Sequence, residues 1–348
     1  MRHNTEAVDV KEIGRQLGVR YVLEGSLRKG GNRIRVTAQL VEAESGTHVW
    51  AERYDRDLTD IFAVQDEITE AVTIAIVPAI ADAEQHRALR KPPGSLDAWA
   101  AYQRGLWHLS KPSAEDNALA EKFFQRAIDL DPMFAGGYTG LAAAFDRVGF
   151  FQPRNLGEAQ SAEEAMARRA VVLDSADAEA HSRLAIALGS RGDHRGALAE
   201  AERALAISPN LADAHGALGA VLTFSGRPEE GLAALKSCIR LDPRAPFLVF
   251  RLIQIAIALY FCREYAATVE AAQQVIRSFP DHFHPYGVLA AALGQMGQTA
   301  EAKEVLEKAV EIAPERFENL VRGRYRSLRP EDHAHMLDGL RKAGMLEE

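Results

Sequence analysis

The sequence predicts a mainly α-helical chain of repeated helical hairpins, preceded by a small α/β region with a three-stranded antiparallel sheet. Three observations support this fold class. A pattern of small and apolar residues returns every 34 residues, the apolar residues within each copy follow helical spacing, and three alternating strand-like runs stand near the start. A fixed period of this length indicates a repeat array, in which each unit packs mainly against its neighbours.

The repeated unit is a helical hairpin whose second helix ends at a proline. Pro209 and Pro243 stand 34 residues apart, and so do Pro280 and Pro314. Proline ends the helix because it supplies no amide donor and disfavours helix in the residue before it. Upstream of these prolines, apolar residues fall at i, i+3, i+4 and i+7, the face of an amphipathic helix. Small residues stand where the two helices of a hairpin must approach closely, namely Ala185, Gly219 and Ala290.

This pattern resembles the tetratricopeptide repeat, which places a large residue, Leu, a small residue and Tyr on its first helix and Ala, an aromatic residue, Ala and Pro on its second. The resemblance implies a right-handed superhelix with a concave groove lined by the first helices. We expect about six hairpins over residues 96–314 and a capping segment over residues 315–348. An insertion around Phe150–Leu156 is a candidate recognition loop, although a tolerated surface insertion is the more frequent case.

Residues 1–89 predict a small α/β region that ends in a long helix. Three runs of alternating apolar and polar residues predict an antiparallel meander, and glycines within residues 29–32 and 44–47 favour hairpin turns. Residues 90–95 contain two prolines and predict a semi-rigid linker to the repeats. The predicted strands are Tyr21–Arg28, Arg33–Val41 and His48–Tyr54, and the predicted helices are Asp9–Leu17 and Asp60–Leu89.

A second resemblance covers this N-terminal region. Gly18–Ser26, Trp50–Asp55 and Ile61–Ile68 resemble the TolB-like α/β domain that precedes tetratricopeptide repeats in bacterial class III adenylate or guanylate cyclase-type proteins. The same pair of regions also follows winged-helix DNA-binding domains. The family's opening strand, helix and strand have no counterpart in this sequence, so residues 1–89 would form a partial domain. The exposed sheet edge then predicts a homodimer through the incomplete sheet.

Composition and motifs narrow the function classes. We find no phosphate loop, dinucleotide fingerprint, nucleophile elbow or zinc-ligand spacing, so we expect no catalytic residues, no metal and no cofactor. Net charge is −8 with both signs interspersed, which gives no basic face for direct nucleic-acid binding. The sequence has only two cysteines, begins with a polar stretch and contains no long apolar run. These features predict a cytoplasmic location without a membrane span.

The tetratricopeptide resemblance also places candidate binding residues. It assigns the second, fifth, ninth, twelfth and thirteenth positions of each first helix to the groove. In the fourth and fifth hairpins several of these positions are large and apolar, which favours an apolar or helical partner segment. The alternative is that these side chains pack against the chain's own neighbouring helix or C-terminal cap. The candidate partner-binding residues are Phe224, Phe250, Ile257, Tyr260 and Phe261.

The sequence therefore favours a non-catalytic protein-interaction and regulatory module of a bacterial signalling protein, whose groove binds a protein or peptide segment. Two alternatives stay open. The chain could be the regulatory C-terminal part of an adenylate cyclase whose catalytic domain lies upstream of Met1, or the tail of a winged-helix transcription regulator.

Overall fold

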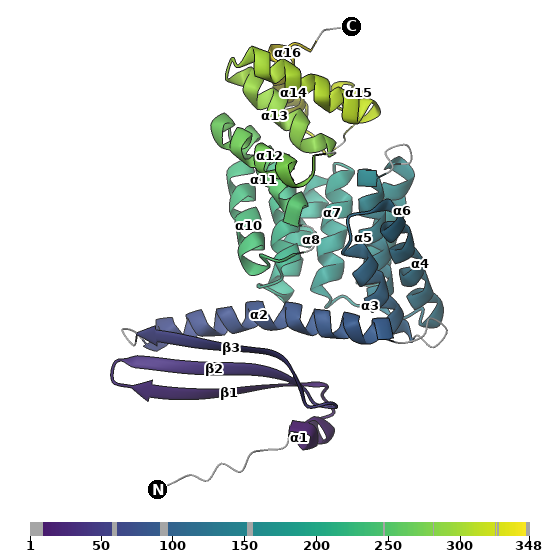
Figure 1. Ribbon diagram of the computed structural model, residues 1–348. Helices are drawn as coiled ribbons and strands as arrows, with labels where there is room; N and C mark the ends of the chain where they lie inside the picture. Colours follow the sequence, from purple (N-terminus) through teal and green to yellow (C-terminus); the bar gives the residue numbers. More distant parts are fainter. Residues whose placement is uncertain are drawn as a thin grey trace. The chain divides into compact units, whose positions relative to one another are not determined.

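The structure is a computed structural model that describes residues 10–57, 61–90, 97–151, 156–245, 248–280, 282–323, 325 and 327–345. The chain divides into two compact units, an N-terminal unit of residues 1–91 and a C-terminal unit of residues 92–348. The described residues form sixteen helices and one sheet of three strands (Figure 1). The predicted fold class, mainly helical with a small three-stranded antiparallel sheet, is confirmed.

The sheet of the N-terminal unit is an antiparallel meander with strand order β1-β2-β3. Each predicted strand is present and is longer than predicted. Register pairs Gly30 with Arg33 and Arg33 with Asp57, so pairing continues to the turns, where Gly31 and Gly46 adopt positive φ. The elements are α1 (Val10–Leu17), β1 (Tyr21–Gly30), β2 (Arg33–Glu42), β3 (Thr47–Asp57) and α2 (Ile61–Arg90). Asp9 and Asp60, predicted as the first residues of the two helices, lie outside the described residues.

The long helix α2 covers one face of this sheet (Figure 1). Ile34 and Ala38 alternate along β2 and therefore point to the same side, where they pack with Tyr54 of β3 and with Val64 and Ile68 of α2. These five buried side chains form a small core. The N-terminal unit thus depends on one layer of apolar contacts between a sheet and a helix.

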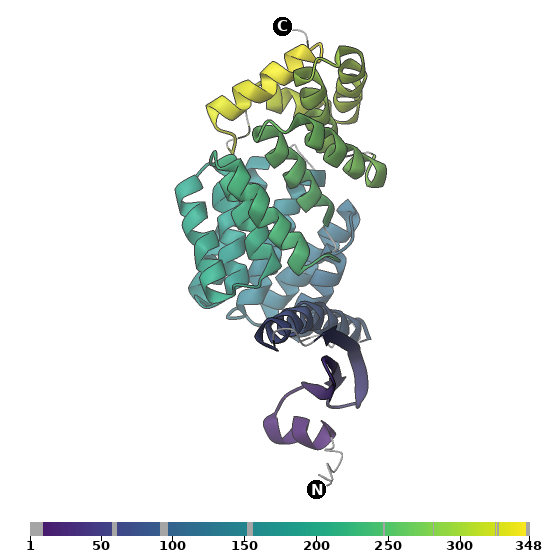
Figure 2. The same cartoon turned by 90° about the vertical axis from the view of Figure 1, so that its left-hand side faces the viewer.

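The C-terminal unit is built from successive antiparallel helical hairpins that stack side by side (Figures 1 and 2). Consecutive first helices also lie against one another, from α3 to α13. The hairpins are α3 (Ala98–Leu109) with α4 (Ala114–Leu130), α5 (Ala135–Phe151) with α6 (Leu156–Leu173), α7 (Ala178–Ser190) with α8 (His194–Ile207), α9 (Ala212–Phe224) with α10 (Pro228–Leu241), α11 (Leu248–Phe261) with α12 (Tyr265–Ser278), and α13 (Phe283–Gln295) with α14 (Thr299–Ile312).

Small residues allow the close helix contacts that the repeat pattern indicates. A Cβ at Gly219 of α9 would lie 2.6 Å from Leu235 Cγ of α10, so only glycine fits at this crossing. Ala185, Ala201 and Ala217 form a buried alanine cluster between neighbouring hairpins. Close packing of this kind makes the array intolerant of added bulk at these positions.

The second hairpin differs from the regular ones because its helices are longer. Helices α5 and α6 have 17 and 18 residues, whereas α7 and α8 have 13 and 14. Part of the insertion predicted around Phe150–Leu156 therefore lengthens two helices, and its central residues 152–155 lie outside the described residues. Residues 91–95 of the predicted linker also lie outside them, while its first residue, Arg90, is the last residue of α2.

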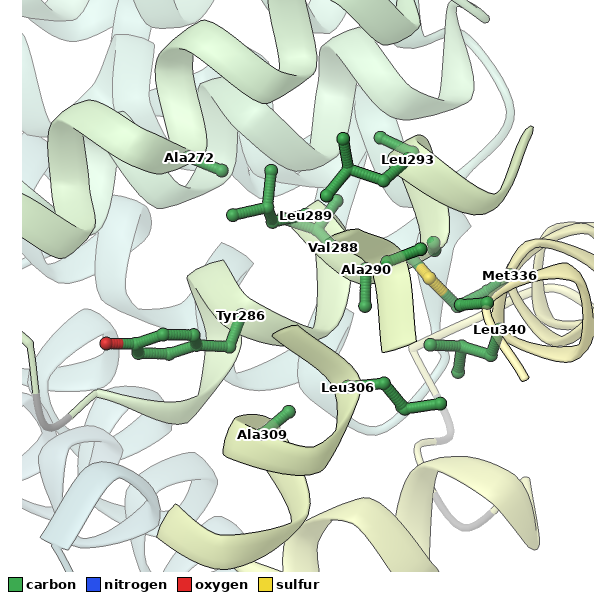
Figure 3. Close-up of a cluster of buried hydrophobic side chains, with 14 of the residues drawn as sticks. Ala272, Tyr286, Val288, Leu289, Ala290, Leu293, Leu306, Ala309, Met336 and Leu340 are labelled. Carbon is green, nitrogen blue, oxygen red and sulfur yellow. The ribbon is translucent and has the colours of Figure 1, made fainter. Parts of the chain in front are cut away.

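Two further helices, α15 (Pro314–Val321) and α16 (Pro330–Lys342), follow the last hairpin. Figure 3 shows Met336 and Leu340 of α16 pointing toward Ala290 and Leu293 of α13. Leu340 is fully buried in this cluster. Helix α16 is therefore part of the core at this end of the array and packs on a first helix.

Candidate functional site

Four of the five candidate residues lie on α11, and Tyr260 is the most buried of them, with 0% of its surface exposed. Its Oη donates a hydrogen bond to the His335 carbonyl of α16 at 2.9 Å. The ring centroids of Tyr260 and His335 lie 4.8 Å apart. Tyr260 thus packs against the C-terminal helix, the arrangement that the sequence left open as the alternative to partner binding.

The other four candidate residues are half-buried. Phe261 and Ile257 pack at the edge of the cluster that contains Tyr260, and the ring of Phe224 lies 6.4 Å from that of Phe261. Phe250 packs with a separate cluster around Val275, and its ring contacts His282 edge to face. The structure brings the candidates into two neighbouring apolar clusters, and their role in binding a partner stays a prediction.

Helix α16 lies on positions that the repeat pattern assigns to the groove. Besides Tyr260, it contacts α13 so closely that a Cβ on Gly294 would lie less than 3.0 Å from the Gly339 carbonyl. Gln295 donates to the Asp338 carboxylate at 2.9 Å. The first-helix face, meaning the surface formed by α5, α7, α9, α11 and α13, is therefore covered by α16 at its α11–α13 end.

Further along the first-helix face, arginines and carboxylates from four helices come together. Asp213 of α9 accepts one hydrogen bond from Arg183 Nη2 of α7 at 2.8 Å and one from Arg251 Nη2 of α11 at 3.0 Å. Arg251 passes over Gly216, where a Cβ would overlap the guanidinium. We call the following residues the arginine–carboxylate cluster: Asp146 and Arg147 of α5, Glu179 and Arg183 of α7, Asp213 of α9 and Arg251 of α11.

The charges in this cluster perturb one another. Burial raises the pKa of Glu179 to about 7 and also raises that of Asp146, although Arg183 opposes both shifts. Burial works in the same direction on Asp213, but Arg183 and Arg251 overcome it and hold the pKa of Asp213 below its usual range. Burial and the nearby charge of Arg183 lower the pKa of Arg147 to about 9. Two kinds of carboxyl group thus coexist, one firmly ionised and the others easily protonated.

The cluster is reachable from solvent even though its arginines are largely covered. The Asp213 side chain is 40% exposed, whereas those of Arg183 and Arg251 are 14% and 12% exposed. Arg183 Nε is buried and has no hydrogen-bond partner. Glu179 and Asp213 occupy the second position of α7 and α9, which the repeat pattern assigns to the groove, whereas the pattern does not point to the two arginines that bind Asp213. The available signal was separation along the chain, because both arginine–aspartate pairs lie about one repeat period apart.

Other features of the described residues offer less chemistry. Within the described ranges, no group of three or more His, Cys, Asp or Glu side chains is arranged to hold a metal ion. His282 and His284 lie 5.1 Å apart, ring to ring, and burial lowers the pKa of His282 to about 4. An open pocket of about 620 Å³ lies among α10, α11 and α12, lined by apolar residues such as Leu232 and Leu259 and by polar ones such as Glu270 and Arg277. Among the helices that the structure describes, none is long and apolar enough to cross a membrane.

Comparison with known proteins agrees with the repeat geometry. Residues 283–316, which contain α13 and α14, match the family model described as "Tetratricopeptide repeat". This match identifies the hairpin of α13 and α14 as a tetratricopeptide repeat, and the stacked hairpins of the C-terminal unit have the fold of a tetratricopeptide-repeat array.

One curated relative is "Putative adenylate cyclase 3" of Rhizobium meliloti (strain 1021), which is 36% identical to the chain over 187 residues. The match covers 52% of this chain and 31% of the relative, so the chain spans about a third of that protein. Among solved structures, "Crystal structure of APC/C hetero-tetramer Cut9-Hcn1" is 13% identical, with a TM-score of 0.53 over 75% of this chain and 46% of that chain. "Crystal structure of YrrB: a TPR protein with an unusual peptide-binding site" is 20% identical, with a TM-score of 0.38 over 58% of this chain and 97% of that chain. At 13% identity, the Cut9-Hcn1 structure supports the fold alone.

Proposed function

We propose that this chain is a non-catalytic protein-interaction module of a bacterial signalling protein, in which the first-helix face of the array binds a segment of a partner protein. The observation that carries the proposal is the arginine–carboxylate cluster. Burying charged groups costs free energy, and apolar side chains of similar volume often stabilise a fold better. Charges gathered from α5, α7, α9 and α11 on one face therefore fit a role in recognition better than a role in packing.

The signalling role rests on the cyclase-type relative. The chain shares 36% identity over 187 residues with part of a protein named as a putative adenylate cyclase, which favours a regulatory part of a cyclase over the tail of a winged-helix regulator. In this proposal the array senses a cytoplasmic partner, and the catalytic step belongs to another domain. Cyclic AMP formation by residues 1–348 alone, dependent on a divalent metal, would contradict the non-catalytic assignment.

A second contact is proposed at the sheet of the N-terminal unit. In the described residues β1 pairs only with β2, which leaves its outer edge open, and its Leu23 and Leu27 are 50% and 65% exposed. An open edge with exposed apolar side chains favours pairing with another strand. A homodimer through β1 would be detected by light scattering after size exclusion, and Leu27→Lys should shift the chain to monomer. A monomeric wild-type chain across micromolar concentrations would rule this contact out.

Selection from a random-peptide phage library tests the main proposal, with the full chain immobilised. We expect enriched peptides that bind the wild type and lose binding to Arg183→Ala and Arg251→Ala. The matched control is Arg168→Ala, because Arg168 is an exposed arginine of α6 that pairs with Glu164 on its own helix. Circular dichroism of each variant checks that the helices persist. No enrichment, or peptides that bind all variants equally, would refute binding at the first-helix face.

A further inference from the structure

We propose that the arginine–carboxylate cluster binds an acidic side chain of the partner segment, with the partner's carboxylate received by Arg183 and the neighbouring arginines. This inference rests on the proposed function and specifies the chemistry of what the first-helix face takes. Three features of the cluster support it: the hydrogen-bond donors of Arg183, the balance of charge in the cluster, and the way this charge changes with pH.

Arg183 has hydrogen-bond donors that a ligand could use. A guanidinium carries five N–H donors and no acceptor. Arg183 uses Nη2 on Asp213, while its Nε is buried and has no partner. A buried donor without an acceptor costs free energy that a ligand oxygen recovers. A carboxylate suits this position because its two oxygens can accept parallel bonds from the Nε and Nη sides of one guanidinium.

The balance of positive and negative groups in the cluster also bears on the charge of the ligand. Asp213 is one carboxylate shared by two guanidiniums, Arg183 and Arg251, and Arg147 adds a third positive charge nearby. Burial raises the pKa values of Asp146 and Glu179, so these carboxyls lose negative charge first as pH falls. Glu163 of α6, only 2% exposed, follows the same direction, with its pKa raised well above normal by burial. When these carboxyls are protonated, the guanidiniums of Arg147, Arg183 and Arg251 outnumber the Asp213 carboxylate, and the cluster then favours an anion over a cation.

Proton linkage distinguishes an acidic ligand from a basic one, because the two would shift the pKa of Glu179 in opposite directions. Glu179 faces Arg183 on its own helix, the helix cap Asp177, Asp213 of α9 and Tyr102 of α3, while Asp146 and Arg147 of α5 act on Arg183. A carboxylate arriving beside Glu179 raises the pKa of Glu179 further, so binding takes up a proton and strengthens as pH falls. A basic ligand would lower that pKa, release a proton and weaken as pH falls.

The test uses three short synthetic peptides of one alanine–serine host whose two central residues are Glu-Glu, Gln-Gln or Lys-Lys. Binding to the full chain is followed by fluorescence anisotropy and by NMR of the arginine Nε–H groups at about pH 6 and about pH 8. We expect the Glu-Glu peptide to bind at least about tenfold more tightly than the Gln-Gln peptide, and to gain up to about tenfold as pH falls from about 8 to about 7, below which Glu179 is already mostly protonated in the free chain. The Arg183 Nε–H signal should shift on binding.

Variants separate charge, hydrogen bonding and folding. Arg183→Lys keeps the charge but lacks the Nε–H donor, and we expect it to lose most of the Glu-over-Gln preference. Glu179→Gln should keep the preference and lose most of the pH dependence. Arg168→Ala should behave as the wild type. Rescue of part of the affinity by Arg183→Lys relative to Arg183→Ala would separate the ionic contribution from the hydrogen bond.

Each contrary result has a distinct meaning. Equal affinity for the Glu-Glu and Gln-Gln peptides, preference for Lys-Lys, failure of the Glu-Glu peptide to bind at millimolar concentration, or binding that strengthens as pH rises would overturn the acidic-ligand inference. The proposed function would survive any of these results if library peptides still require Arg183. Failure of the library selection itself would refute the proposed function instead.

Discussion

At the scale of single residues, the tightest packing that a substitution can test lies around Phe124. This ring is fully buried between Gly105 of α3 and Gly140 of α5, and a Cβ at either glycine would lie less than 3.0 Å from ring atoms. Gly140→Ala should therefore lower the free energy of unfolding by about 1–3 kcal/mol, because the enclosed ring cannot move aside. That loss exceeds the gain of about 1 kcal/mol in helix propensity. Urea unfolding followed by circular dichroism measures the difference.

The matched control for this prediction is Gly157→Ala. Gly157 lies in the first turn of α6, and a Cβ there would meet no atom within 4 Å. The control should be neutral or stabilising by about 0.5–1 kcal/mol, because only backbone entropy and helix propensity change. Equal effects at the two positions would show that the Phe124 contact does not limit stability.

Glu179 gives a pH-dependent prediction at the same scale. Its pKa is raised to about 7 by burial, so the folded state holds this proton more tightly than the unfolded state does. The resulting stabilisation is complete below about pH 4.5 and is lost as pH rises through about 7. Glu179→Gln removes that loss. The free energy of unfolding of the variant, relative to that of the wild type, should therefore rise by about 1–2 kcal/mol from about pH 5 to about pH 8. Urea unfolding at both pH values measures it.

The control for Glu179→Gln is Glu301→Gln on α14, whose side chain is exposed and therefore screened by solvent. Its stability relative to the wild type should stay nearly constant over the same pH interval. If Glu179→Gln also stays constant, the carboxyl of Glu179 is well solvated and the electrostatic description of the cluster is wrong.

At the scale of secondary-structure elements, the docking of α16 depends on a glycine. A Cβ at Gly339 would lie 2.7 Å from the Ala291 carbonyl and would also meet Tyr260 Oη. Gly339→Val should therefore separate α16 from α11 and α13, with the loss of the Tyr260–His335 hydrogen bond. Amide hydrogen exchange should show a large loss of protection over residues 330–342 and an increase at the facing turn of α13.

Ala334→Val supplies the comparison, since Ala334 is an exposed position on the same helix. It has the same β-branched side chain but no close neighbour, so exchange in α16 should change only by the small cost in helix propensity. Equal deprotection in the two variants would mean that α16 is held by its ends rather than by the glycine contact. Loss of protection in Gly339→Val alone would also expose Tyr260, which would make its predicted partner-binding role testable.

The elements themselves were largely predictable from the sequence, because their signals are local. Apolar spacing of two residues identified β1, β2 and β3, and helical spacing with terminal prolines identified the regular hairpins. The strand ends were placed too early because the pairing of Gly30 with Arg33 depends on the partner strand, not on the apolar pattern. The position of α16 was not predictable for a related reason. Its contact needs Gly294 and Gly339, whose meeting depends on the tertiary fold.

At the scale of the whole molecule, the arginine–carboxylate cluster shows why the candidate site was only partly predicted. Arg183, Asp213 and Arg251 stand on three different helices, and each one alone reads as a solvated charge on a helix face. Stacking of consecutive repeats brings side chains about one period apart within 2.8 to 3.0 Å. A search for opposite charges 30 to 38 residues apart on successive first helices would have found the pairs, whereas a search for apolar groove residues favoured the α11 rings.

The two compact units also predict two separate unfolding transitions. The core of the N-terminal unit consists of one layer of apolar side chains between a three-stranded sheet and α2, which supports only marginal stability. The C-terminal unit contains every hairpin and the extended core at α13 and α16, and its repeats stabilise one another through neighbour contacts. We therefore expect the N-terminal unit to unfold at a lower urea concentration than the array.

Tryptophan placement makes this last prediction measurable. Trp50 lies in β3, whereas Trp99 and Trp107 lie in α3, so Trp99→Phe with Trp107→Phe leaves Trp50 as the reporter of the N-terminal unit. Its fluorescence transition should precede the loss of helix seen by circular dichroism, which α3 to α16 dominate. A fragment of residues 97–345 should keep the helical transition of the full chain within a few degrees in thermal melts, after allowance for the two substitutions. Coincident transitions that shift together when residues 1–96 are removed would instead show that the units unfold as one, because removal of a separately folded unit leaves its neighbour's internal contacts unchanged.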